Sequence, residues 1–337
     1  MNHPLPHSDV LKHIVDVHCH PTDSEITEEH MRELEITICA MATRQDDQEL
    51  VADLASKYPD KVIPCFGFHP WFTHWICTLT GPPPPKEEHY RYVLREQLKS
   101  EQHEKDFNRL LDYLPDPIAL DDCLANLRQN LYKFPQAMVG EVGMDRSARI
   151  PFDYRVEKRE LSKFVVPFDH QIEILEAQLH VAVELKRNVS LHSVKSPKPT
   201  ADLLERMRLE HGALWSEINL DLHSCGLSPE LWRIIERKHS NVFLSLSTAI
   251  NTRSLNHLKL IEAVSPTRLL VESDIHQVWQ TTSRCWEMLS IIGETKGWKV
   301  ENNWEIEGVE EPFGVVRRID ANWALFARGI HVSRTID

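Results

Sequence analysis

The sequence predicts an α/β protein folded as a single (β/α)8 TIM-type barrel, with a long insertion between strands three and four. The prediction depends on eight short apolar runs, the helical patterns between most of them, and the ionisable residues at their ends. Near-continuous hydrophobicity is typical of strands buried on both faces of a parallel sheet. Strands that alternate with helices favour βα units, and eight units favour a closed barrel. A doubly wound open sheet is the alternative, but no GxGxxG follows the first strand.

Each predicted strand is a short run of apolar, often β-branched residues. In chain order the runs are IVDVHCH (14–20), ITICAMAT (36–43), VIPCFGFHP (62–70), AMVGEVGMD (137–145), NVSLHSV (188–194), EINLDLHSC (217–225), NVFLSLS (241–247) and RLLVESD (268–274). Clear helical patterns lie between them at 46–58, 170–186 and 229–239.

Residues 71–136 separate the third and fourth strands by more than one helix requires. This stretch contains PPPP at 82–85, a charged helical run at 86–113 and a PDP turn at 115–117. A proline tract ends any helix and forms a stiff, extended piece. We expect an insertion above or beside the barrel, within one domain that spans 1–337.

A second irregular stretch, 275–311, follows the last strand. It carries four tryptophans, which we expect to pack in the core rather than to bind a ligand. They are Trp279, Trp286, Trp298 and Trp304.

The net charge of −13 bounds the class of partner. An acidic protein repels polyanions, which argues against broad electrostatic binding of nucleic acid. A nuclease remains compatible, because bound metal ions supply local positive charge.

The seven cysteines are scattered and include no CxxC pair, so they form a poor disulfide framework and a poor zinc set. Buried reduced thiols suit a cytoplasmic or nuclear protein. The N-terminus has no apolar signal-peptide core, and no run of 18 apolar residues occurs, so we expect no membrane association.

Residues able to bind metal fall at the C-terminal ends of five predicted strands. They are His18, His20, Glu141, His192, His223 and Asp274. The i, i+2 spacing of His18 and His20 directs both side chains to one face of a strand. Active sites of such barrels lie at the C-terminal strand ends. Taken singly, each histidine favours a hydrogen-bonded structural role, Asp274 a helix cap and Glu141 a loop carboxylate. Together they predict a site for two divalent ions, bridged by Glu141 about 3.5–4 Å apart.

The chain resembles the TatD-related DNases of the amidohydrolase superfamily over about 14–274. VDVHCH resembles the opening D-x-H-x-H motif of the family, FGFHPW its G-x-H-P, GEVGMD its G-E-x-G-x-D, LHS and DLHSCG its two later histidine motifs, and VESD its E-[TS]-D. The segment NWALF at 322–326 is similar to the final helix of the family. GFHPWFTHWI and the long insertion look most like a fungal branch of the family.

The resemblance implies a role for each motif residue. His18, His20 and Asp274 would bind the first metal ion, His192 and His223 the second, and Glu141 would bridge them. His69 and Asp145 match positions near the site that are not ligands. Asp16 and Glu272 match residues that orient their neighbours.

Two departures affect the substrate. Bacterial members carry an arginine where this chain has Val194, and Lys195 or Lys198 could replace it as a phosphate contact. After Asp274 the family has a Ser-Pro or similar pair, whereas here Ile275 and His276 follow. Both departures leave the metal chemistry intact.

The expected activity is 3'-5' exonuclease-type hydrolysis of single-stranded or short DNA. A water activated by two metals attacks the phosphodiester, Asp274 accepts its proton, and the ions neutralise the developing charge. Mg²⁺ or Mn²⁺ suits phosphodiesters, whereas four imidazoles favour Zn²⁺.

Two alternatives remain. An amidohydrolase-type small-molecule hydrolase would usually bridge its metals through a modified lysine on strand four, where this chain has Glu141. A weakly catalytic protein could instead bind a protein partner through the 71–136 insertion.

Overall fold

The computed structural model describes residues 4–156, 158–304 and 314–328. Eight parallel strands form one sheet, in the order β1-β2-β3-β6-β9-β10-β11-β12. They are β1 (Val15–Cys19), β2 (Thr37–Met41), β3 (Val62–Phe66), β6 (Met138–Asp145), β9 (Val189–Val194), β10 (Leu220–Leu222), β11 (Val242–Leu246) and β12 (Leu269–Val271). Each lies within one of the eight predicted runs, so the predicted strands are confirmed.

The first and last strands meet and bring the sheet to a nearly closed barrel. The backbone N–H of Asp274 donates to the carbonyl of His18 at 3.0 Å, and that of His20 donates to the carbonyl of Ile275 at 2.9 Å. The predicted (β/α)8 barrel is therefore confirmed. Its core consists of strand residues without solvent exposure, such as Ile38 and Leu244.

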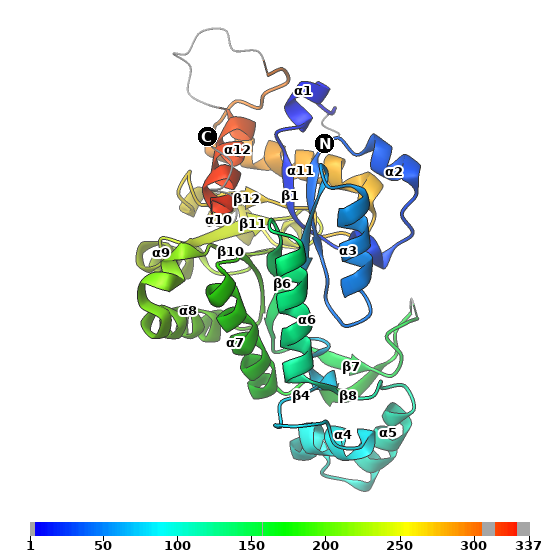
Figure 1. Ribbon diagram of the computed structural model, residues 1–337. Helices are drawn as coiled ribbons and strands as arrows, with labels where there is room; N and C mark the ends of the chain where they lie inside the picture. Colours follow the sequence, from blue (N-terminus) through cyan, green and yellow to red (C-terminus); the bar gives the residue numbers. More distant parts are fainter. Residues whose placement is uncertain (1–3, 157, 305–313, 329–337) are drawn as a thin grey trace.

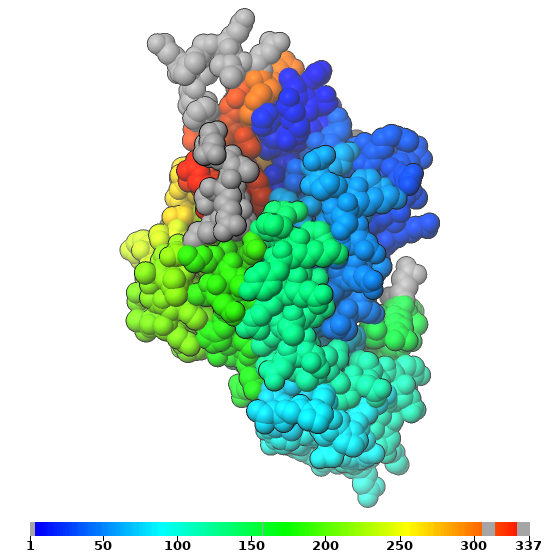
Figure 2. Space-filling model, viewed as in Figure 1, coloured from blue at the N-terminus to red at the C-terminus, as the bar shows by residue number. Residues whose placement is uncertain are grey.

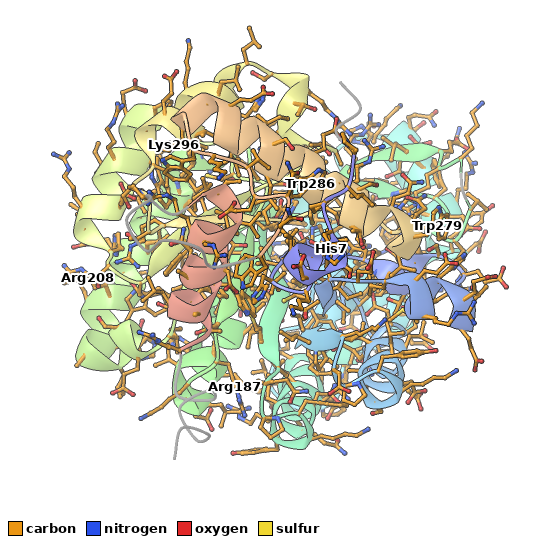
Figure 3. All side chains as sticks on the ribbon, turned by 90° about the horizontal axis from the view of Figure 1, so that it is seen from above. His7, Arg187, Arg208, Trp279, Trp286 and Lys296 are labelled. Atoms are coloured by element: carbon orange, nitrogen blue, oxygen red, sulfur yellow. The ribbon has the colours of Figure 1, made fainter. Side chains whose placement is uncertain are left out.

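Most of the helices cover the outside of the barrel, whereas α4 and α5 lie below it (Figure 1; Figure 3 shows the molecule from above). They are α1 (Ser8–Leu11), α2 (Glu28–Glu33), α3 (Gln48–Lys57), α4 (Lys86–Leu94), α5 (Glu101–Leu111), α6 (Leu120–Lys133), α7 (Phe168–Leu185), α8 (Pro197–His211), α9 (Pro229–Lys238), α10 (Asn256–Ala263), α11 (Val278–Lys296) and α12 (Val315–Ala327). The three helical patterns correspond to α3, α7 and α9. NWALF lies within α12, as the resemblance implied.

The 71–136 stretch divides into two parts. Its last helix, α6, packs against α7 and is the regular helix between β3 and β6. The remainder, up to β5 (Ile118–Ala119), extends from the lower end of the barrel in Figures 1 and 2. This is the end at which the parallel strands finish.

The predicted helix at 86–113 is two helices, α4 and α5, separated by a 3-10 turn at Arg95–Gln97. The break has a local cause, because Ser100 caps the second helix. Its side chain accepts a hydrogen bond from the backbone N–H of His103 at 3.2 Å. The sequence analysis missed this cap because charged residues continue without a break through 86–113.

The sequence analysis missed a β-hairpin that packs against the insertion. It comprises β7 (Arg149–Pro151) and β8 (Leu161–Val165), which pair antiparallel after β6. Buried hydrophobic residues of the insertion and of the hairpin form one cluster, with Tyr90 and Phe107 from one and Phe164 from the other. We call residues 71–119 and 146–167 the lobe. Because each segment follows a barrel strand and leads into a helix that packs on the barrel, α6 or α7, we propose that lobe and barrel form one domain.

The tryptophans after β12 mostly pack in the core as expected. Trp286 is buried, and Trp298 and Trp304 pack against the barrel core. Trp279 is 49% exposed and lies at the edge of the molecule in Figure 3. The rest of the 275–311 stretch, beyond 304, lies outside the described residues.

All seven cysteines are buried and free, as predicted. Among the described residues, no helix has both the length and the apolar character that a membrane span requires.

Candidate metal centre

The six predicted metal-binding side chains meet inside the barrel around one carboxylate, that of Glu141. The sequence analysis put Glu141 at the end of its strand, but it lies within β6. The strand continues because its last residues pair with β9, up to Asp145 opposite Val194. Glu141 is 3% exposed.

One oxygen of Glu141 faces the residues from the first and last strands. Glu141 Oε2 lies 3.3 Å from Nε2 of His20 and 3.6 Å from Nε2 of His18. These two imidazole nitrogens are 3.1 Å apart. Asp274 Oδ1 lies 3.7 Å from His20 Nε2 and 4.0 Å from His18 Nε2.

The other oxygen of Glu141 faces the middle strands. Glu141 Oε1 lies 2.7 Å from Nε2 of His223 and 2.8 Å from Nδ1 of His192. These two nitrogens are 3.2 Å apart. Each carboxylate oxygen therefore has its own pair of imidazoles.

This arrangement fits divalent metal ions. Two donors that each lie 2.0–2.1 Å from one zinc ion at right or tetrahedral angles are about 2.8–3.4 Å apart. The nitrogen pairs of 3.1 and 3.2 Å meet that spacing. The donor set of imidazole nitrogens and carboxylate oxygens suits zinc and other divalent transition metals.

His69 lies against the same carboxylate, with Nε2 3.3 Å from Glu141 Oε1. Its other ring nitrogen, Nδ1, accepts a hydrogen bond from the backbone N–H of Trp71 at 3.1 Å. A neutral imidazole whose Nδ1 accepts carries its proton on Nε2. His69 is then a donor to Glu141, although its ring also belongs to a group with Glu141 and His192 whose ligand atoms lie within 4.8 Å of one another.

The side chains of the cluster shift one another's pKa values. Burial would raise the pKa of Glu141, but the rings of His69, His223 and His18 outweigh it and hold the pKa well below its usual value. Burial lowers the pKa of His18 to about 3, and His223 adds to the shift.

The pKa values of two other imidazoles in the cluster are raised instead. Burial would lower the pKa of His20, but Glu141 and Asp274 outweigh it and raise the pKa to about 9. Asp145 and Glu141 likewise outweigh burial at His192 and raise its pKa to about 9. Metal ligands must be deprotonated, so an ion that binds these rings replaces their protons.

Asp16 and Glu272 contact residues next to the cluster, and a Glu272 oxygen also lies within 4.8 Å of ring nitrogens of His18 and His223. Asp16 accepts hydrogen bonds from the backbone N–H groups of His18 at 3.2 Å and Ser273 at 2.9 Å. Glu272 accepts from the backbone N–H of Ser224 at 2.7 Å, and the Ser224 hydroxyl oxygen lies 2.6 Å from Glu272 Oε1 and 2.9 Å from Asp274 Oδ2. Both carboxyls therefore fix the loops that carry ligand candidates.

A third buried carboxyl, Asp221, belongs to the same network. The Ser245 hydroxyl lies 2.7 Å from Asp221 Oδ2 and 2.5 Å from Glu272 Oε2. One hydroxyl has one proton, so one of these carboxyls must carry a proton of its own. Burial raises the pKa of Asp221 to about 7 and that of Glu272 well above its usual value.

Asp145 connects the cluster to the lobe. Its Oδ2 lies 3.8 Å from His192 Nε2 and accepts a hydrogen bond from the Trp71 indole N–H at 2.7 Å. Its Oδ1 accepts from the backbone N–H and the hydroxyl of Ser147, both at 2.7 Å. Burial would raise the pKa of Asp145, but His192, Trp71 and Ser147 outweigh it and lower the pKa.

The two proposed phosphate contacts differ in their surroundings. Lys195 is exposed and directly follows β9 with a left-handed φ of 51°. Lys198 pairs with Asp202 at 2.5 Å within α8. Lys195 is thus nearer to the ligand strand, and its charge is free of an ion pair among the described residues.

Sequence reasoning missed several polar contacts of the site. Ser190 Oγ lies 2.7 Å from His18 Nδ1, and Ser224, Asp221 and Trp71 make the contacts given above. Two of these carried a signal, because Ser190 and Asp221 precede His192 and His223 by two residues and share their strand faces. The Trp71 contact depends on the lobe and had no such signal.

Comparison with known proteins gives matches across the chain. The sequence model described as TatD related DNase matches residues 15–293. Cut9-interacting protein scn1 from Schizosaccharomyces pombe is 30% identical over 327 residues, covering 87% of this chain and 95% of that protein. Deoxyribonuclease TATDN3 from Homo sapiens is 24% identical over 306 residues, covering 87% of this chain and 91% of that protein.

Solved structures share the fold. The TatD homologue YJJV from Escherichia coli k12 superposes with a TM-score of 0.57 at 17% identity, over 94% of this chain and 98% of that chain. An uncharacterized amidohydrolase from Saccharomyces cerevisiae superposes with a TM-score of 0.59 at 13% identity, over 96% of this chain and 100% of that chain.

Proposed function

This chain belongs to the TatD-related DNase family and is a metal-dependent hydrolase of that type; from this premise we propose that it is a deoxyribonuclease that uses two divalent ions. Its substrate would be single-stranded or short DNA, cleaved from the 3' end. A human relative is named as a deoxyribonuclease, which supports a nucleic-acid substrate.

The observation that carries the proposal is the division of Glu141 between two sets of nitrogens. His18, His20 and Asp274 would hold one ion, and His192 and His223 the other. Bound there, divalent ions would acidify a water and neutralise charge on the phosphoryl oxygens.

The chain itself would supply positioning and proton transfer. Asp274 is suited to accept the proton of the attacking water, because His18, His223 and His20 outweigh burial and lower its pKa, which keeps it ionised. With Oδ1 as the proposed ligand atom beside His20, Asp274 Oδ2, which lies 2.9 Å from the Ser224 hydroxyl, would accept the proton. His69 would restrain the bridging carboxylate through its Nε2–H.

The acidic balance supports a short substrate. A chain with net charge −13 gains little from a long polyanion, whereas a single-stranded end presents few phosphates. We propose Lys195 as the phosphate contact in place of the missing arginine at Val194, with Lys198 second because of its pairing with Asp202.

A second role, as a protein partner, is favoured by one observation. The relative of 30% identity is named for its interaction with another protein. We propose the lobe as the surface for such a partner, since it stands clear of the barrel in Figure 2. The two roles are compatible. We further propose a cytoplasmic or nuclear location, on the strength of seven buried free thiols.

The test is a metal-reconstitution assay on the full chain. Protein stripped with EDTA is loaded separately with Zn²⁺, Mn²⁺ or Mg²⁺ and given 5'-labelled single strands, duplexes, and a panel of amides and lactones. We expect loss of activity on chelation, recovery with metal, and single strands shortened stepwise from the 3' end faster than duplexes. A Glu141→Gln protein prepared in parallel controls for contaminating nuclease. Turnover of an amide or lactone with no oligonucleotide cleaved under any metal would favour the small-molecule hydrolase.

A further inference from the structure

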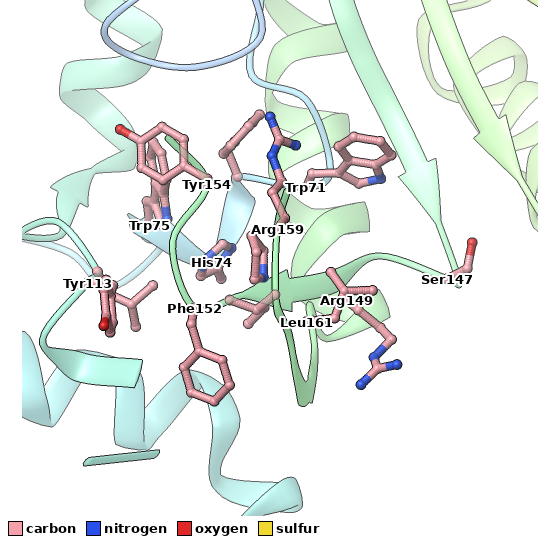
Figure 4. A pocket seen from close by; sticks show the side chains of 14 residues that line it. Trp71, His74, Trp75, Tyr113, Ser147, Arg149, Phe152, Tyr154, Arg159 and Leu161 are labelled. Carbon is pink, nitrogen blue, oxygen red and sulfur yellow. The ribbon is translucent and has the colours of Figure 1, made fainter. Parts of the chain in front are cut away.

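A pocket of about 250 Å³ lies in the lobe, between the 3-10 turn η2 (Thr73–Trp75) and the hairpin (Figure 4). Its walls are mainly aromatic: Trp71, Phe72, Trp75, Tyr113, Phe152 and Tyr154. One planar ring system fits such a space, and a stack of several does not.

The pocket adjoins the metal-facing cluster through one shared carboxylate. Trp71 and Ser147 both line the pocket, and they donate hydrogen bonds to the two oxygens of Asp145, each at 2.7 Å. Asp145 in turn faces His192. The centroids of the Trp71 and His192 rings are 6.5 Å apart. The edge of the pocket at Trp71 and Ser147 is therefore the side that adjoins the cluster.

The rim of the pocket carries an arginine side chain whose charge is not paired within the described part of the chain. Arg159 is exposed and has no ion pair or hydrogen bond with another described residue. In Figure 4 its guanidinium lies on the same side of the pocket as Trp71. Arg149 differs, since its guanidinium points away and donates to the carbonyl of Ser162. Arg159 can thus accept an anionic group at the pocket entrance.

The lining also includes a buried polar group without a partner. His74 is 2% exposed, and neither ring nitrogen makes a hydrogen bond with a described residue. An unsatisfied buried polar group costs about 1–3 kcal/mol. This polarity favours a ligand with donors and acceptors at its edge over a hydrocarbon.

We propose that this pocket is a nucleobase subsite, which receives the base of the nucleotide whose phosphodiester lies at the cluster. Aromatic walls bind a base by stacking whatever its sequence. Arg159 then contacts a phosphate of the same strand. The assignment rests on the proposed function, because it names the base-binding part of that site.

Direct binding tests the pocket without catalysis. Deoxyadenosine monophosphate is titrated into the metal-free full-length protein, with the fluorescence of Trp71 and Trp75 in the pocket wall as the readout. Deoxyadenosine, deoxyribose 5-phosphate and p-cresol are titrated in parallel. We expect the nucleotide to bind most tightly. Equal affinity for p-cresol would indicate a pocket for an apolar protein side chain and overturn the proposal.

Paired variants locate the binding. Leu161→Trp fills the pocket from β8, and Val165→Trp is its matched control, on the same exposed face of that strand but outside the lining. Arg159→Ala removes the rim charge, and Arg95→Ala is the control on the same lobe. We expect about tenfold weaker nucleotide binding in Leu161→Trp. Arg159→Ala should weaken binding of the nucleotide and leave that of deoxyadenosine unchanged. Unchanged nucleotide affinity in both variants would overturn the subsite.

Kinetics separate the subsite from the proposed function. Leu161→Trp should raise KM about tenfold for an oligonucleotide with a normal terminal base, and leave KM unchanged when the terminal nucleotide is abasic. Equal effects on both substrates would overturn the subsite while leaving the nuclease intact. If the nucleotide binds as expected but the metal-loaded protein cleaves no oligonucleotide, the proposed function fails and the pocket stands.

Discussion

Glu141 contacts a different pair of imidazoles through each of its carboxylate oxygens, and glutamine can replace it with almost no change in size. In Glu141→Gln, one oxygen becomes an amide nitrogen, which is a donor and cannot bind a cation. We expect a fall in bound metal from two ions per chain and a loss of activity well beyond the 10–100-fold typical of outer contacts. Elemental analysis and rate measurements would check this.

The control for that variant is Glu210→Gln. Glu210 lies 3.8 Å from His180 in a partly exposed His/Glu group on the outer helices, away from the barrel interior. It should keep full metal content and activity. A Glu141→Gln protein with normal circular dichroism, two bound ions and undiminished turnover would rule out the bridging role.

His69 and His192 lie at similar distances from Glu141 Oε1, yet we expect opposite outcomes for their removal. His192→Phe should lose one ion, because Nδ1 is a proposed ligand. His69→Phe should keep both ions, with about 10–100-fold weaker affinity, because only a donor to the carboxylate is lost. Metal titration of each variant separates stoichiometry from affinity. Loss of a whole ion in His69→Phe would make His69 a ligand.

At this scale the sequence predicts which residues meet, but not how they face one another. His18 and His20 were predictable from their i, i+2 spacing on a strand. The proton position on His69 was not, since it depends on the backbone N–H of Trp71. The hydroxyls of Ser224 and Ser245 are likewise set by tertiary contacts rather than by a local pattern.

Among the elements, the eight strands were predictable because both of their faces are buried, so that each reads as a continuous apolar run. The hairpin was not. β7 has three residues, and β8 alternates between exposed and buried positions, as in LSKFV. Its buried side chains pack against α5, about 60 residues earlier in the chain, and no local pattern reports such a pairing.

The lobe should be sensitive to acid through His74 in η2. Burial lowers the pKa of His74 to about 3, with His170 and His89 adding to the shift. Between pH 6.5 and pH 3, His74 therefore binds a proton in the unfolded chain but not in the folded chain. The free energy of unfolding consequently falls as the pH falls from 6.5 toward 3. The free energy of unfolding should fall by about 1.4 kcal/mol per pH unit in that window from this group alone.

His74→Phe removes that dependence and keeps an aromatic ring. Urea unfolding of both proteins at pH 7.0 and pH 5.5 should show the variant gaining about 1 kcal/mol on the parent at the lower pH. Above pH 7 the difference between them should be constant. Parallel stability curves down to pH 4 would show that His74 is protonated in the folded protein.

Because the whole molecule has a net charge of −13, each lysine near the site should have a measurable effect on the binding of an anionic substrate. We expect the salt dependence of KM for a single-stranded oligonucleotide to be shallow, and Lys195→Ala to reduce its slope by about 0.7. Lys198→Ala is the matched control, since its ammonium is already paired with Asp202. A slope that changes only in Lys198→Ala would reverse the assignment, and a slope that changes in neither would remove both lysines from the interface.

The backbone hydrogen bond from Asp274 to His18 that joins the last strand to the first also has a consequence for biosynthesis. Proteins fold as they leave the ribosome, N-terminal parts first. His18 in β1 and His20 just after it emerge early, but their partner Asp274 is about 250 residues away. A nascent chain cannot complete its first ion position until nearly all of it has been made. Truncated products of interrupted translation should therefore lack hydrolase activity.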